Sequence, residues 1–254
     1  MAAPDPPAAP DDACARLAAL VPNPAVAILN ELHAAGHAAF IVGGSLRDAL
    51  LSRTPADWDM ATDARPDRLV ALFPGAVYEN RFGTVAVRRD REVFEITTFR
   101  TEHDYADFRR PHRVEFGDEI REDLARRDFT VNAMAWGRRR GDGGGGDDGG
   151  GDARSNSLLD PFDGLTDLAL GRLRAVGDPD ARFREDALRM VRAVRLAATL
   201  DFDIEPATLA AIARNVALVG HLSGERVGAE LGKLLGSPGR PSGCGWRRRP
   251  GCWR

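Results

Sequence analysis

The architecture of this chain is best inferred from the stretch Phe40-Ile-Val-Gly-Gly-Ser-Leu-Arg47-Asp48. Its first three residues are apolar and predict a short buried strand, and the two glycines predict a turn that ends it. Ser45 is a residue type that accepts the free N–H groups of a first helical turn, so a helix is expected to begin there. Bare N–H groups at the positive end of a helix dipole bind anions, and Arg47 would add a forked cation. The stretch therefore predicts a phosphate site between a strand and a helix.

Two carboxylates follow this stretch closely, in the sequence Asp57-Trp-Asp59. Side chains alternate along an extended strand, so Asp57 and Asp59 are expected on one face. Two such groups repel each other unless a cation lies between them, and Mg²⁺ bound to a nucleotide phosphate is the natural candidate. Taken alone, a Gly-Gly pair is usually a turn, and an Asp-x-Asp is usually a solvated loop or a helix cap. In this order and spacing they predict a metal-dependent nucleotide site.

Composition and charge narrow the class of protein. The chain has 254 residues and a net charge of −3, which allows a sizeable core but gives no global basic field for nucleic acid. No apolar run approaches the ~20 residues that span a membrane. Cys14, Cys244 and Cys252 lie in the tails without metal-ligand companions, which favours a reduced, cytoplasmic setting. Residues 1–23 are interpreted as a disordered leader and not as a signal peptide.

The order of the hydrophobic patterns predicts an α/β half followed by a helical half. Strands are expected over residues 57–62, 77–78, 83–87, 93–99 and 172–176, and helices over residues 24–35, 66–73, 120–127, 183–199, 206–219 and from 223. We therefore place a mixed sheet with flanking helices over residues 24–177 and an all-helical domain over residues 178–236. The glycine-rich segment 138–156 is expected to be a disordered insertion. Residues 237–254 are expected to be unstructured, and we hypothesise that they are not native structure.

Glu95 lies at the centre of the alternating segment 93–99, in which Phe94 and Ile96 occupy the opposite face. A glutamate there marks either an edge or solvent face, or a third carboxylate near Asp57 and Asp59. Both interpretations stay open at this point, and we favour the second.

A basic loop follows that strand directly, with its charge concentrated at Arg109, Arg110 and Arg113. Basic loops are commonly just solvated. Because this one comes straight after the proposed metal strand, we expect residues 100–117 to form a moving flap over triphosphate or RNA.

Further motifs occur in the order Arg126-Arg127-Asp128-Phe-Thr-Val-Asn132, Asp160-Pro-Phe-Asp-Gly164, Glu185-Asp-Ala-Leu-Arg189 and Ser223-Gly-Glu-Arg-Val-Gly-Ala-Glu230. Together with the first two motifs, they resemble the nucleotidyltransferase superfamily. The closest resemblance, over residues 38–235, is to the bacterial-type (class II) family of CCA-adding tRNA nucleotidyltransferases and poly(A) polymerases. It implies an α/β nucleotidyltransferase head and an all-helical neck. That family continues into helical body and tail domains, which we expect this chain to lack.

The resemblance also implies roles for individual residues. Asp57 and Asp59 would be catalytic and hold two Mg²⁺, with Glu95 as a further catalytic carboxylate. Nucleotide binding would fall to Gly43, Gly44, Ser45, Arg47, Asp48, Arg126, Arg127, Asp128, Asn132, Glu185, Asp186, Arg189, Arg192 and Arg195. Arg109, Arg110 and Arg113 would bind RNA.

Two of these assignments have a physical rationale of their own. Asp128 can accept a hydrogen bond from a ribose 2′-hydroxyl, which a deoxynucleotide lacks. On a continuous helix, Glu185, Arg189 and Arg192 would share one face, and Asp186 would pair with Arg189 at i+3. An aspartate and an arginine offer acceptor and donor edges that mimic a base. The alternative for this motif is an exposed, salt-bridged helix face. The last motif, which begins at Ser223, is expected to be structural, with a helix cap and charge pairs within its helix.

The resemblance implies an enzyme that adds CCA to the 3′ end of tRNA from CTP and ATP in the cytoplasm by a two-metal mechanism, and it leaves open an enzyme that adds only CC or only A. Poly(A) polymerase is the nearest alternative because it shares head and neck. Arg81-Phe-Gly-Thr-Val85 and Glu185-Asp-Ala-Leu-Arg189 resemble the CCA branch more closely. A second alternative, from another class, is an RNA-binding remnant without turnover, although binding alone does not require two adjacent carboxylates. No membrane or DNA partner is expected.

Overall fold

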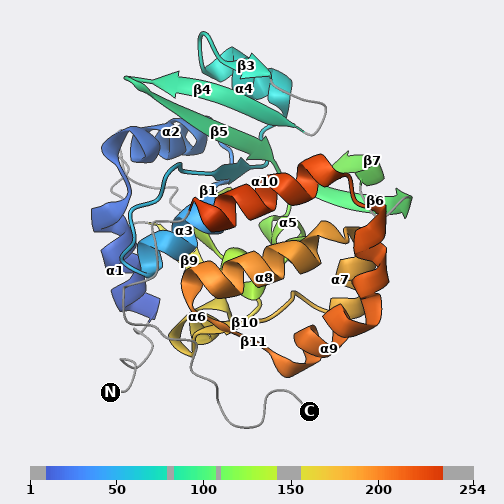
Figure 1. Cartoon of the computed structure of the whole chain (residues 1–254). Helices are drawn as coiled ribbons and strands as arrows, with labels where there is room; N and C mark the ends of the chain where they lie inside the picture. The colour runs from blue at the N-terminus through green and yellow to red at the C-terminus, as the bar shows by residue number, and fades with distance from the viewer. Residues whose placement is uncertain (1–9, 79–82, 107–109, 142–155, 237–254) are drawn as a thin grey trace.

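A seven-stranded mixed sheet organises the first half of the molecule (Figure 1), a computed structural model that describes residues 10–78, 83–106, 110–141 and 156–236. The strand order is β3-β4-β5-β2-β1-β8-β9. Its strands are β1 (Ala39–Val42), β2 (Met60–Thr62), β3 (Val77–Tyr78), β4 (Thr84–Arg89), β5 (Glu92–Thr98), β8 (Ala135–Arg138) and β9 (Ser157–Leu159). β2 and β5 run parallel, and every other pair in this sheet is antiparallel. The predicted mixed sheet is confirmed.

Helices cover both faces of this sheet because β1, an interior strand between β2 and β8, is apolar on both sides. Ala39 and Ile41 pack into one core cluster, and Phe40 and Val42 pack into another. The helices of this half are α1 (Pro10–Leu20), α2 (Asn23–Ala34), α3 (Gly43–Leu50), α4 (Pro66–Leu72), α5 (Ile120–Ala125) and α6 (Gly164–Ala169), with the 3₁₀ turn η1 (Thr130–Asn132). Residues of α1, α2 and α4 belong to the first cluster, and residues of α5 belong to the second.

A separate two-stranded hairpin projects from this half, formed by β6 (Arg100–Ala106) and β7 (Arg110–Phe116). Its residues are those of the basic loop that we expected to form a flap. Arg110 and Arg113 lie on β7, although their side chains are outside the described set, and Arg109 lies outside the described residues.

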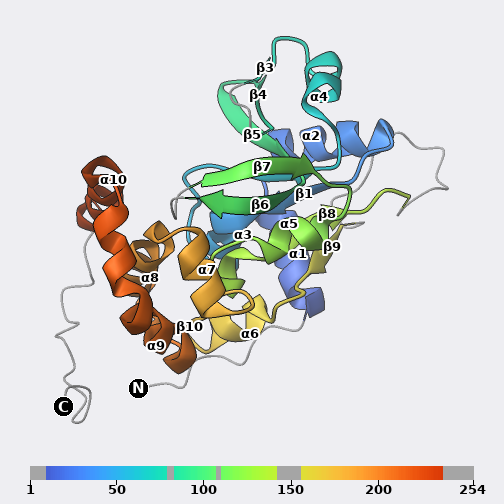
Figure 2. The same cartoon turned by 90° about the vertical axis from the view of Figure 1, so that its right-hand side faces the viewer.

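The second half is helical, as predicted. It consists of α7 (Pro179–Glu185), α8 (Leu188–Leu200), α9 (Pro206–Asn215), η3 (Val216–His221) and α10 (Gly224–Leu235). α7 packs on α9 and α8 packs on α10, and Figures 1 and 2 show these helices gathered beside one end of the sheet. One short parallel pair, β10 (Arg172–Leu173) with β11 (Asp203–Ile204), links the two halves. The helical half is called the neck below, and residues 24–177 the head.

Three sequence predictions need correction. Residues 10–20 of the predicted leader form α1, because Ala13 and Leu17 are buried in the core. The predicted helix over 183–199 is broken, since α7 ends at Glu185 and α8 begins at Leu188. The predicted insertion is ordered at its edges, where β8 extends to Arg138 and Asn156 is buried. Residues 1–9, 142–155 and 237–254 lie outside the described residues.

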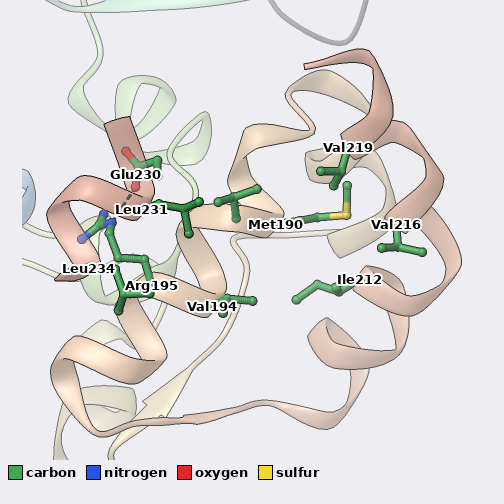
Figure 3. A pocket seen from close by; sticks show the side chains of 10 residues that line it. Met190, Val194, Arg195, Ile212, Val216, Val219, Glu230, Leu231 and Leu234 are labelled. Atoms are coloured by element: carbon green, nitrogen blue, oxygen red, sulfur yellow. Dashed lines mark hydrogen bonds and ion pairs between the residues drawn. The ribbon is translucent and has the colours of Figure 1, made fainter. Parts of the chain in front are cut away.

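An apolar groove lies on the neck between α8, α9, η3 and α10 (Figure 3), with a volume of about 200 Å³. Val194, Ile212 and Leu231 are among its lining residues, and its two charged lining residues are Arg195 and Glu230. These two form an ion pair at one end of the groove. The groove is therefore an apolar surface bounded by a charged pair.

Among the described residues, no single helix has the length and apolar character to cross a membrane. α1 and α2 satisfy such a test only as a pair bent by 108°, and buried residues of both helices belong to the core.

Candidate functional site

The junction of β1 and α3 holds the first predicted site residues. α3 begins at Gly43, earlier than predicted, and its N-cap residue Val42 makes no side-chain cap bond. The Ser45 hydroxyl donates to the Val42 carbonyl at 2.9 Å and accepts the Asp59 N–H at 3.3 Å. The prediction that Ser45 caps α3 is therefore wrong. Its hydroxyl instead ties the end of β1 to the backbone of Asp59.

The Asp-x-Asp pair lies just before β2 and not within it, which corrects the predicted strand over 57–62. The Asp59 carbonyl accepts the Val42 N–H at 3.0 Å, so the sheet still fixes the position of Asp59. Burial, and then the neighbouring charge of Asp57, raise the pKa of Asp59, while Arg127 opposes the rise. The carboxylates of Asp59 and of the exposed Asp57 repel each other, and together they are a fitting donor set for a hard divalent cation.

Gly43 lies against this pair. A Cβ at Gly43 would come within 3.0 Å of Arg127 Nη1 and 3.2 Å of Asp59 Oδ2, and the backbone φ of +75° also favours glycine. A carboxylate and a guanidinium therefore approach bare backbone at the start of α3. This arrangement leaves N–H groups, a cation and carboxylates together, as a triphosphate with its metal requires.

Asn132 connects the next residues of the site. Its Oδ1 accepts from Arg47 Nη1 at 2.7 Å, and its Nδ2 donates to Asp128 Oδ1 at 3.0 Å. Its carbonyl accepts from Arg127 Nη1 at 3.4 Å. Arg47 also binds Asp48 through Nε and Nη2, at 2.9 and 2.8 Å. The structure thus brings together the motif at residues 43–48 and the motif at residues 126–132.

Asp123, which sequence reasoning missed, holds the two arginines of that motif. It is 1% exposed and accepts from Arg126 Nη2 at 2.6 Å and from Arg127 Nη2 at 3.3 Å. Burial alone would raise the pKa of Asp123, but Arg126 and Arg127 hold it below its ordinary value. The i+3 and i+4 spacing from Asp123 to these arginines was the available sequence signal.

Asp128 joins the head to the neck. Its Oδ2 accepts from Arg192 Nε and Nη2 at 2.8 and 2.6 Å, and its Oδ1 accepts from Asn132 and from the Phe129 N–H. Burial would raise the pKa of Asp128, but the Arg192 charge and the Asn132 hydrogen bond lower it to about 2. The Asp128 charge in turn raises the pKa of Arg192. Protein donors therefore occupy both oxygens of Asp128 in this state.

The neck motif is arranged differently from the predicted helix face. Glu185 and Arg189 do form the expected i+4 ion pair, at 2.7 Å. Arg189 Nη2 also donates to the Arg126 carbonyl of the head at 2.9 Å. Asp186 instead lies in the break between α7 and α8, with an extended backbone, and its carboxylate pairs with Arg226 of α10 at 2.9 Å. The predicted Asp186–Arg189 side-chain pair is therefore replaced by a contact that sequence spacing could not show.

Arg195 and the last motif are linked in the same way. Arg195 Nε donates to Glu230 Oε2 at 2.5 Å, and Arg192 lies 3.8 Å from Glu230 Oε1. The predicted charge pair within α10 is present between Glu230 and Lys233 at 3.5 Å. Ser223 occupies the N-cap position but makes no side-chain cap bond. The last motif thus packs its charged side chains mainly against α8.

Other predicted residues are less closely tied to this cluster. Glu95 lies exposed on β5, and the parallel register pairs its neighbour Ile96 with Met60, directly after Asp59. Among the described residues, no three His, Cys, Asp or Glu side chains lie close enough to hold a metal ion. A third carboxylate role for Glu95 therefore stays a prediction, as does RNA binding by the hairpin arginines. Gly44 lies beside Arg47, whose Nη2 would be 3.4 Å from a Cβ there.

Comparisons with known proteins identify the relatives of this chain. Residues 39–174 match the family described as the poly A polymerase head domain, and residues 201–242 match the probable RNA- and SrmB-binding site of polymerase A. A CCA-adding enzyme of Lacticaseibacillus paracasei is 47% identical over 220 residues, covering 86% of this chain and 51% of that protein. The chain thus spans about half the length of the curated relatives it matches.

Solved structures are similar over the same part of the chain. The CCA-adding enzyme of Bacillus stearothermophilus in complex with CTP has a TM-score of 0.72 at 38% identity, covering 85% of this chain and 48% of that one. The Thermotoga maritima CCA-adding enzyme complexed with tRNA has a TM-score of 0.68 at 25% identity, covering 89% and 50%. Because the head-domain match spans more than half of its residues, the chain belongs to the poly(A) polymerase head-domain family, whose relatives here are CCA-adding enzymes.

Proposed function

We propose that this chain carries the nucleotidyl-transfer site of an enzyme that adds CCA to the 3′ end of tRNA, using CTP and ATP without a nucleic-acid template. The observation that carries the proposal is the meeting of Asp59, Gly43 and Arg127 at the start of α3. The names of the relatives favour CCA addition over poly(A) synthesis.

Asp57 and Asp59 would hold two Mg²⁺ ions in the two-metal mechanism that we propose. When bound, these ions would supply positive charge to the phosphates and lower the pKa of the attacking 3′-hydroxyl. Glu95, on the adjacent strand β5, is the proposed third carboxylate. Ile96 pairs with Met60, and Glu95 and Asp59 directly precede these two residues.

The chain's own groups would bind and orient the triphosphate. The backbone N–H groups at Gly43 and Gly44 open α3 and suit phosphate oxygens. Arg127, fixed by Asp123 and by the Asn132 carbonyl, supplies a cation beside the carboxylates. Arg47, Asp48 and Arg126 would complete the polar wall, and Ser45 would hold Asp59 in place.

The neck would select the base. Asp186 offers an acceptor and Arg189 a donor. Three ion pairs hold or extend this set: Glu185 with Arg189, Arg192 with Asp128, and Arg195 with Glu230. We also propose that Asp128 recognises the ribose 2′-hydroxyl. Because protein donors occupy both of its oxygens, that contact requires nucleotide binding to displace or share one of them.

The RNA partner would be the 3′ end of tRNA, approached by the β6–β7 hairpin with Arg109, Arg110 and Arg113. Basic side chains at this position would neutralise backbone phosphates. We place the reaction in the cytoplasm.

The test is incorporation of labelled CTP and ATP into a tRNA transcript that ends at the discriminator base, in the presence of Mg²⁺. Wild type should add C, C and A, and the variant with both Asp57→Ala and Asp59→Ala should add nothing while it still binds nucleotide. A variant with Asp12→Ala is a matched control, because Asp12 is an exposed aspartate on α1.

Each outcome separates the alternatives. Long A tracts would replace our proposal with poly(A) synthesis. Nucleotide binding by wild type without any incorporation would support an RNA-binding remnant and overturn the proposal of turnover for this chain.

A further inference from the structure

α10 directs two charged side chains toward α8. Arg226 reaches Asp186, with its Nη2 at 2.9 Å from Oδ2 and 3.2 Å from Oδ1. Glu230, one turn later, receives Arg195. Figure 1 shows α10 lying along α8, and the two helices pack on each other. One face of α10 therefore contacts the helix that follows the proposed base-reading aspartate.

Asp186 depends on such contacts for its orientation. It lies in the break between α7 and α8, with an extended backbone of φ −144° and ψ 106°. Its Oδ1 accepts the Leu188 N–H at 3.0 Å, which anchors one oxygen locally. Arg226 is the contact from another element, and it bridges both oxygens. A carboxylate that is bonded from two directions is held in one orientation. A carboxylate with a single local hydrogen bond can still rotate.

Arg226 is itself poised for a further contact. Its side chain is 23% exposed, yet its second terminal nitrogen, Nη1, is buried and has no hydrogen-bond partner among the described residues. A buried guanidinium N–H without an acceptor is unfavourable, and it marks a place where an acceptor would be stabilised.

Glu230 fixes the neighbouring arginines. It is 4% exposed, and although burial would raise its pKa, the hydrogen bond and charge of Arg195 keep the pKa lowered. Arg192, 3.8 Å from Glu230, bonds to Asp128 of the head. A continuous set of ionic contacts therefore runs from α10 through α8 to the head.

We propose that Arg226 is a positioning residue for nucleotide choice, which holds the Asp186 carboxylate in the orientation that distinguishes one base from another. This inference rests on the proposed function, because it assumes that Asp186 faces the base. It assigns to α10 a role in specificity in addition to its role in packing.

The test measures equilibrium binding of labelled CTP, UTP, ATP and GTP to the full chain, without tRNA, for wild type, Arg226→Gln and Arg226→Lys. Arg226→Gln should reduce the preference for CTP over UTP by about tenfold, the effect of losing one charge-assisted hydrogen bond that acts on only one ligand. Arg226→Lys keeps the charge but not the fork, so it should restore part of the preference. The unfolding midpoint of each variant is measured beside it.

Arg214→Gln is the matched control. Arg214 forms an arginine–aspartate pair with Asp180 in the same neck, but on an exposed surface. It should leave the nucleotide preference unchanged, whatever it does to stability.

The outcomes distinguish this inference from the function on which it rests. If wild type binds all four nucleotides alike, the proposed function fails. If wild type discriminates and Arg226→Gln discriminates equally well, the positioning role is overturned while the function stands. If Arg226→Gln does not fold, Arg226→Lys decides, since an unchanged preference there would equally refute the role.

Discussion

The contact between Asp128 and Arg192 joins head to neck, and replacing Asp128 by Asn should break it. Folding lowers the pKa of this carboxyl from 3.8 to about 2. That change stabilises the folded chain at neutral pH by about 2.4 kcal/mol. The Asn side chain also replaces one accepting oxygen by an amide N–H. This N–H would face the donor of Arg192, or the donors of Asn132 and Phe129. We therefore expect Asp128→Asn to lower the free energy of unfolding by about 3 kcal/mol.

The pH dependence of this loss identifies its cause. Because the folded pKa lies below the unfolded one, the stabilisation is present above pH 3.8 and is lost as the pH falls through about 2. At pH 3 it amounts to about 1.3 kcal/mol, so the difference between wild type and variant should narrow by about 1 kcal/mol.

Urea unfolding at pH 7 and pH 3 measures both quantities, with Asp180→Asn as the control. Asp180 pairs with Arg214 at 2.5 Å, but in an exposed position, and its replacement should have the smaller effect. A double-mutant cycle of Asp128→Asn with Arg192→Gln should show a coupling of about 1–3 kcal/mol. A loss below about 1 kcal/mol, or a loss that does not change with pH, would refute the assignment of this stability to the ion pair.

Two further variants test the site and the core. Gly43→Ala should weaken nucleotide binding and cost about 1–3 kcal/mol of stability, because its backbone has φ +75° and the new Cβ would lie 3.0 Å from Arg127 and 3.2 Å from Asp59. Gly44→Ala, without a positive φ, is the control, and equal effects of the two variants on nucleotide binding would contradict this explanation. Burial, and then the nearby Arg138 charge, lower the pKa of His33 to about 4, so wild type should lose about 2 kcal/mol of stability between pH 7 and pH 5 as the unfolded chain takes up a proton. His33→Gln should remove most of this dependence in urea unfolding, and an unchanged pH profile would show that His33 is not its source.

Local patterns were sufficient for the core of the head. The apolar residues of β1, the alternation along β5 and the glycines at the start of α3 are all properties of neighbours in sequence. Phe94 and Ile96 are buried on one face of β5, as the alternation predicted, because the two faces of a strand meet different surroundings. The family motifs contain Gly43, Asp59 and Arg127, which the structure brings together at the candidate site.

The predicted boundaries failed where long-range contacts outweighed local preference. The first fourteen residues are rich in Ala, Pro and Asp and suggested a leader, yet the buried face of α1 packs on the core of the head. Residues 183–199 have helical composition throughout, but Asp186 interrupts them and pairs with Arg226, 40 residues later. Intrinsic helix propensity is weaker than a tertiary contact such as this ion pair, so it does not keep these residues in one helix.

Local sequence patterns were enough to predict the fold class, the motifs and the charges available to the site. Which charges meet depends on the packing of distant elements: Asp128 with Arg192, Asp186 with Arg226, and Glu230 with Arg195. The physical reason is that helical spacing specifies neighbours within one helix, whereas ion pairs between helices depend on how those helices pack. Sequence spacing predicted the Glu185–Arg189 pair correctly for the same reason. The contacts that join head, α8 and α10 therefore became visible only in the folded chain.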